Sequence, residues 1–136
     1  MIISVLLAIF IVLHGMVHLL YFGQSARFFD LQPGMVWPDG AWAFSRFLNN
    51  STIRNLASIA LILAAIVFVV AGAGILFKQA WWRPVIVGAA LLSSVIFLLF
   101  WDGSLRNLDN KGGVGILINL AFLAALFIMK WPKIGF

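Results

Sequence analysis

Four long apolar stretches, separated by polar segments, run along the chain at residues 2–21, 53–77, 84–101 and 114–131. Each is close to the ~20 residues that a helix needs to cross a hydrocarbon core of ~30 Å. None shows the strict alternation of a strand, and in lipid only helices and closed barrels satisfy their backbone hydrogen bonds. The pattern therefore predicts an all-α membrane protein, a bundle of four transmembrane helices in one domain over residues 1–136.

The longest connection, residues 23–52, is polar and contains several proline and glycine turn signals. Within it, residues 41–48 are rich in aromatic side chains and follow Asp39, a residue type that often caps helices. Two alternatives stay open for this segment: a short helix lying at the membrane interface, or a loop that packs over the bundle.

Composition supports a membrane protein and excludes the sites that need cysteine. The chain is 64% hydrophobic and 10% charged, whereas a soluble domain has ~45–50% apolar and ~25% charged residues. It has no cysteine, which excludes disulfides, thiolate metal sites and iron–sulfur clusters. The net charge of +5 comes from scattered residues at the helix ends rather than from a basic run. We therefore expect contact with the lipid bilayer and none with nucleic acid.

The distribution of charge predicts an orientation. With four spans, both termini share a side with the second loop, and that side carries Lys78, Arg83, Lys130 and Lys133 but no acid. The other side carries five cations in two longer loops and all four acids. Because cations in short segments best report the cytoplasmic side, we expect both termini in the cytoplasm and the first and third loops outside. The expected location is the inner membrane, as a multi-pass protein.

His14 and His18, the only histidines, lie four residues apart in the first apolar stretch. An ionisable side chain at membrane depth is costly, so it usually faces a bundle interior and indicates function. With ~1.5 Å of rise per residue, His18 is expected about three to four residues, ~5–6 Å, below the outer end of its helix, and His14 ~11–12 Å below it.

Other helices contribute polar groups at similar depth. Ser58 is expected ~7 Å and Asn119 ~7–9 Å from the same end, and Asp102 lies just past the third helix. Tyr21 shares a seam with both histidines. The sequence therefore predicts a polar layer in the outer leaflet. Its ligand-binding candidates are His14, His18, Tyr21, Ser58, Asp102 and Asn119.

Four uses of this layer stay open. His14 and His18 could bind one metal ion with Asp102 as third ligand, and zinc accepts that donor set. A haem or chlorin could take one histidine as axial ligand. A quinone-like lipid could bond to the histidines, Asn119 and Tyr21 in an otherwise apolar pocket. In a structural role, each histidine would bond to a neighbouring helix, contributing ~0.6–2 kcal/mol.

These uses correspond to three classes of function. The first is a binding or accessory membrane subunit with a ligand or cofactor site around His14 and His18. The second is a structural subunit that joins other membrane subunits or copies of itself. The third is an enzyme acting on a lipid-soluble substrate, for which a histidine with Asp102 is the available acid–base pair.

The segment Leu13–Phe22, LHGMVHLLYF, resembles the first-helix pattern of small bacterial four-helix membrane proteins of the DoxX-like group. The rest of the chain agrees with that group in helix number and spacing. Some members resemble subunits of quinone-linked oxidoreductases, so the resemblance implies a bacterial inner-membrane protein and adds weight to a quinone ligand.

Overall fold

The computed structural model describes residues 1–136 and is entirely helical, with no strand. Its four α-helices are α1 (Ile2–Ser25), α2 (Asn50–Leu76), α3 (Trp82–Leu99) and α4 (Gly113–Phe127), and a short 3₁₀-helix, η1 (Leu108–Lys111), precedes α4. The predicted all-α class is thereby confirmed. Helices α1, α2 and α3 are long and apolar enough to cross a membrane.

Helix α4 is shorter than the predicted 114–131. Its 15 residues span ~22 Å, less than a typical hydrocarbon core. The chain leaves the helix after Phe127, where the amides of Met129 and Trp131 bond back to the carbonyls of Ala124 and Ala125. Pro132 follows, and a proline disfavours helical geometry at the residue that precedes it, here Trp131. The fourth predicted span is therefore an apolar helix that falls short of spanning length.

The other helices differ from their predicted bounds at the ends. Helix α2 begins three residues early because the Asn49 side chain caps it, accepting a 2.8 Å hydrogen bond from the Thr52 amide. Helix α1 runs one turn beyond Tyr21 because Gln24 and Ser25 are buried and find hydrogen-bond partners there. The extra turn moves both histidines deeper into the bundle than the sequence predicts.

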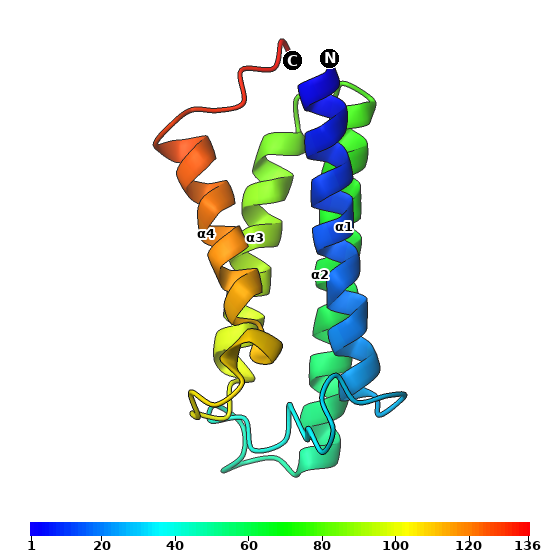
Figure 1. Ribbon diagram of the computed structural model, residues 1–136, viewed down its shortest axis with the longest axis vertical. Coiled ribbons are helices and arrows are strands. Elements are labelled where there is room, and N and C mark those ends of the chain that lie inside the picture. Colours follow the sequence, from blue (N-terminus) through cyan, green and yellow to red (C-terminus); the bar gives the residue numbers. More distant parts are fainter.

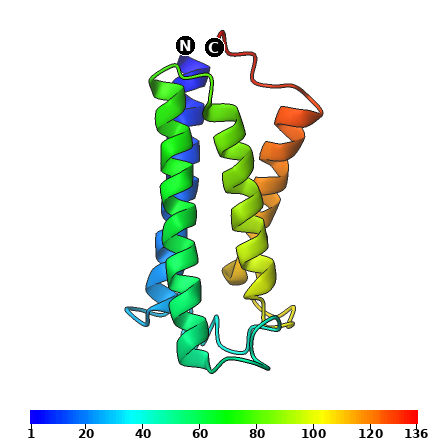
Figure 2. The same cartoon turned by 180° about the vertical axis from the view of Figure 1, so that it is seen from behind.

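The helices are arranged as two pairs. Helix α1 packs along α2 and α4 along α3, and the two pairs meet where α2 packs against α3 (Figures 1 and 2). Both chain termini lie at one end, with the connection between α2 and α3; we call this the terminal end (Figure 1). The long connection 26–49 and the segment 100–112 lie at the opposite end, which we call the loop end.

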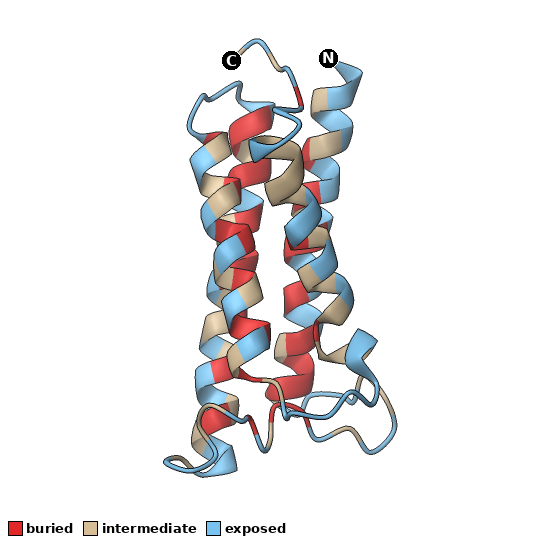
Figure 3. Cartoon of the chain, turned by 90° about the vertical axis from the view of Figure 1, so that its left-hand side faces the viewer, coloured by how far each residue is buried: buried red, intermediate tan, exposed pale blue.

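Buried residues lie on the inner faces of the helices, and exposed residues lie on their outer faces (Figure 3). One apolar cluster at the loop end includes Tyr21, Trp37 and Phe97, and a second at the terminal end includes Phe68 and Trp82. The polar layer described below lies between them. A polar layer thus lies in the middle of the core, between two apolar clusters.

Glycines allow α1 and α2 to approach closely. A methyl group added at Gly15 would lie 2.5 Å from Phe68 Cβ, and one added at Gly72 would lie 2.5 Å from Val12 Cγ2. Both distances are far inside van der Waals contact. Small residues at such points permit close helix contact in membranes, where packing drives association.

Residues 41–48 form consecutive turns instead of the short helix that was one of the two alternatives. The Trp42 indole donates to the Leu98 carbonyl and the Trp42 amide donates to the Trp101 carbonyl at 2.8 Å. The segment is therefore a loop packed over the end of α3.

Candidate functional site

His18 is fully engaged within the protein. Its Nδ1 lies 3.0 Å from the His14 carbonyl and 3.2 Å from the Gly15 carbonyl, so Nδ1 carries a hydrogen. In the neutral ring Nε2 is then an acceptor, and the Ser93 hydroxyl donates to it at 2.7 Å. The side chain is only 1% exposed. This bond joins α1 to α3.

His14 takes part in a second link between helices, with Asn119 at its centre. Its Nε2 lies 2.9 Å from Asn119 Oδ1, and the Asn119 amide donates to Ser94 Oγ at 3.2 Å. Three helices, α1, α4 and α3, are thereby connected. His14 Nδ1 has no hydrogen-bond partner in the protein, yet it is not among the side-chain nitrogens that are both fully buried and unpartnered. His14 Nδ1 is therefore a slightly exposed ring nitrogen without a hydrogen-bond partner in the protein.

Aromatic rings fill the space around the pair. The His14 ring lies 4.8 Å from Phe68 and 5.6 Å from Phe122, and the His18 ring lies 5.7 Å from Phe97, measured between centroids. Two cavities in the protein, of about 770 and 470 Å³, are lined by neither histidine. A ligand at the histidines themselves would have to displace these rings.

The other predicted site residues do not join the histidines in one layer. Tyr21 donates to the Asp109 carbonyl at 3.2 Å, at the loop end. Ser58 donates to the Arg54 carbonyl at 2.7 Å and lies 3.0 Å from the Ser25 hydroxyl. Asp102 is exposed and pairs with Lys111 at 2.9 Å. Of the six candidates, only His14, His18 and Asn119 lie together.

The metal set His14, His18 and Asp102 is therefore not assembled, and no group of three or more His or Asp side chains could hold an ion. The same holds for a histidine–Asp102 acid–base pair. The physical reason is depth: α1 runs on to Ser25, which puts His18 ~10 Å and His14 ~16 Å from that helix end. Asp102 lies beyond the end of α3, beside Lys111.

Ser93 and Ser94 are the partners that the sequence analysis missed. Both lie in α3 and face the polar layer, Ser93 against His18 and Ser94 against Asn119. A signal for them existed, because they are the only polar side chains in the apolar run 85–100. The sequence analysis placed them at mid-membrane, outside the expected outer-leaflet layer, although counted from Trp101 they lie ~10–12 Å deep, the depth expected of His14.

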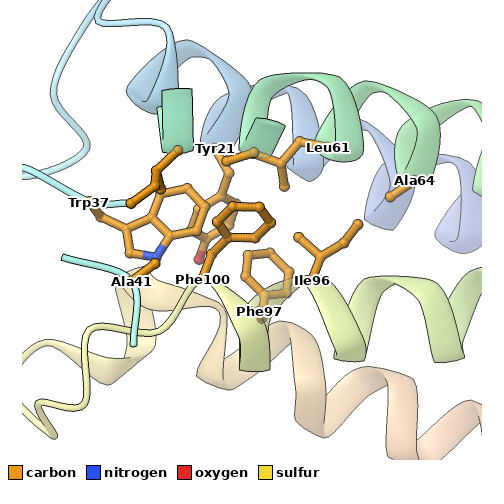
Figure 4. Close-up of a cluster of buried hydrophobic side chains, with 10 residues drawn as sticks. Tyr21, Trp37, Ala41, Leu61, Ala64, Ile96, Phe97 and Phe100 are labelled. Atoms are coloured by element: carbon orange, nitrogen blue, oxygen red, sulfur yellow. The ribbon is translucent and has the colours of Figure 1, made fainter. Parts of the chain in front are cut away.

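Three aromatic residues at the loop end, Tyr21, Trp37 and Phe97, form a contiguous group that we call the aromatic cluster (Figure 4). The Tyr21 ring lies 4.9 Å from Phe97 and 5.6 Å from Trp37. Trp37 Nε1 is buried without an acceptor, an arrangement that costs about 1–3 kcal/mol. The aromatic cluster therefore contains one buried donor without a hydrogen-bond partner.

A groove of about 470 Å³ lies between the end of α3 and the start of α4, and we call it the loop-end groove. Its walls include Phe97, Leu98, Trp101 and Leu117, and Lys111 lies at its polar edge. Phe97 is both a wall of the groove and a member of the aromatic cluster. An apolar cavity of this size, with few polar groups, is typical of sites for small ligands.

Comparison with protein families, with curated proteins and with solved structures finds no match for this chain. The similarity of Leu13–Phe22 to DoxX-like proteins stays a prediction. The candidate site is thus defined by the protein's own geometry, as a buried histidine layer next to an apolar groove.

Proposed function

We propose that this protein is a small multi-pass membrane accessory subunit that binds a quinone-like, lipid-soluble ligand in the loop-end groove. One observation carries the proposal: Phe97 is a wall of an apolar groove of about 470 Å³ and also packs on the ring of Trp37, whose Nε1 has no acceptor. Pockets for apolar ligands combine such walls with a few convergent polar groups.

A quinone carbonyl supplies the hydrogen-bond acceptor that Trp37 Nε1 lacks. Rotation of the Phe97 ring would open the groove toward Trp37, so that a ligand carbonyl accepts the Nε1 hydrogen. An indole N–H in an apolar site usually has a partner, and supplying one removes a desolvation cost of about 1–3 kcal/mol. The aliphatic part of the ligand would lie along Leu98 and Leu117, which face the lipid.

The histidines have a positioning role in this proposal. The His18–Ser93 bond holds α3 against α1 one turn from Phe97, and Phe97 packs on the His18 ring. In the predicted orientation, with both termini in the cytoplasm of a bacterial cell, the groove opens in the outer leaflet of the inner membrane. The resemblance to the DoxX-like group supports the choice of a quinone.

Binding of a short-chain benzoquinone to the purified protein in phosphatidylcholine nanodiscs tests the proposal by titration calorimetry. Leu117→Trp fills the groove and is expected to weaken binding about tenfold or more, equivalent to at least ~1.4 kcal/mol. Leu120→Trp is the matched control, because Leu120 lies on the same helix and is similarly exposed, 54% against 66%, but does not line the groove. Trp37→Phe is expected to weaken binding severalfold.

Equal binding by wild type and Leu117→Trp, or no binding by wild type, would contradict the proposal. A second candidate would then be favoured, a structural subunit of a larger membrane complex. The specific observation for it is that His18 is saturated by internal bonds and that His14, Asn119 and Ser94 link three helices. In that case, substitution of His14 or His18 lowers the stability of the protein, and neither the wild type nor the variants bind the quinone.

A further inference from the structure

The terminal end carries four cationic side chains and no acidic side chain. Its cationic side chains are Lys78, Arg83, Lys130 and Lys133. All four aspartates lie at the loop end, and so do all three ion pairs, which use Asp39 twice and Asp102 once. An anion from outside the protein is therefore the natural partner of this end.

Three of these cations, Lys78, Lys130 and Lys133, are free to bind an anion, and Lys130 does not line the pocket that the other two share. Arg83 is engaged, because it donates to the Pro132 carbonyl at 2.7 Å and lies 4.7 Å over the Trp82 ring. Lys78 and Lys133 form no ion pair and no side-chain hydrogen bond. Both line a single pocket.

That pocket, which we call the terminal-end pocket, has a volume of about 770 Å³. Its apolar walls come from the first turns of α1, from the end of α2 and from the C-terminal tail, for example Val5, Leu76 and Ile134. Trp131 also lines it, and tryptophan is enriched at the level of the lipid headgroups. The pocket therefore combines an apolar surface with two lysines at one edge.

We propose that the terminal-end pocket binds one anionic phospholipid. The phosphate is held by Lys78 and Lys133, and an acyl chain lies against the apolar walls. A lysine ammonium binds phosphate as a point charge, and anionic lipids concentrate in the cytoplasmic leaflet, where the predicted orientation places this end. The lipid would tie the C-terminal tail to α1 and α2. This inference is independent of the ligand proposed for the loop-end groove.

Native mass spectrometry of the full chain, released from nanodiscs that contain phosphatidylglycerol and phosphatidylcholine, measures the bound lipid. We expect one retained phosphatidylglycerol and no retained phosphatidylcholine. The double variant Lys78→Gln/Lys133→Gln is expected to bind phosphatidylglycerol about tenfold more weakly or worse. Ser4→Trp, which fills the pocket and keeps its charge, is expected to weaken binding as well.

The matched control is Arg46→Gln/Arg106→Gln, which removes two cations at the loop end that form no ion pair. It is expected to retain the lipid as wild type does. Equal loss in both double variants would overturn the proposal, because charge rather than the pocket would then account for binding. Displacement of the lipid by millimolar inorganic phosphate would overturn it too, since the pocket would then be a site for a free anion.

Discussion

His14 and Asn119 are joined by a hydrogen bond of 2.9 Å although 105 residues separate them in the chain. The bond crosses from α1 to α4, which belong to different helix pairs. Together with the His18–Ser93 bond, it connects the two pairs through the middle of an otherwise apolar core.

A double-mutant cycle on this pair measures the link. His14→Leu and Asn119→Leu each leave a buried partner unpaired, so each is expected to lower the free energy of unfolding by about 1–3 kcal/mol. The double variant should lose less free energy of unfolding than the sum of the two single losses, and the difference, the coupling energy, is expected to be ~0.6–1.7 kcal/mol. Reversible unfolding in mixed micelles by titration with sodium dodecyl sulfate gives the values. Strict additivity would show that the bond contributes nothing.

Ser93→Ala removes the donor to His18 Nε2 at a fully buried position. The acceptor cannot reach water, so we expect a loss of about 1–3 kcal/mol in the free energy of unfolding. Ser45→Ala is the control, because Ser45 is exposed in the long loop and its side chain forms no hydrogen bond. The two variants should differ clearly in the same unfolding titration, and indistinguishable midpoints would refute this role for Ser93.

Gly72→Ala places a methyl group 2.5 Å from Val12 Cγ2 and 3.0 Å from the Ala8 carbonyl. Helices α1 and α2 must then separate, and we expect destabilisation by about 1–3 kcal/mol, as in other overpacked cores. Gly88→Ala is the matched control, since a methyl group there meets no atom within 4 Å. Alanine is the better helix former by about 0.5–1 kcal/mol, so this control should be neutral or stabilising. Thermal unfolding in detergent compares them.

Asp39→Asn breaks two ion pairs at once, because its carboxylate lies 3.0 Å from both Arg27 and Arg54. These side chains are partly exposed, so we expect a loss of about 0.5–2 kcal/mol that shrinks as salt is added. Asp30→Asn removes the same charge from a residue without an ion pair and should have little effect. Unfolding at low and high ionic strength checks both. An Asp39→Asn effect independent of salt would contradict the electrostatic explanation.

Asp102 was predicted in the site and lies outside it, whereas Ser93 was not predicted and bonds to His18. Helix periodicity correctly placed His14 and His18 on one buried face, and counting depth correctly matched them with Asn119. The prediction added Asp102 and omitted Ser93, although Ser93, counted from Trp101, lies at the depth expected of His14. Which side chain meets a histidine depends on where α1 ends and on how α3 packs against it. An error of one turn shifts a side chain by ~5.4 Å, which is enough to exchange one hydrogen-bond partner for another.

The sequence by itself determined the helical class, the presence of four apolar helices, three of which have the predicted spanning length, and the burial of the histidine pair. These follow from local quantities: the length of each apolar run, its periodicity and the cost of a polar group in lipid. The tertiary structure decided which partners the histidines take, the early end of α4, and the two cavities at opposite ends of the bundle. These depend on how helices approach and where each one ends, and such properties arise from packing between segments that are distant in the chain.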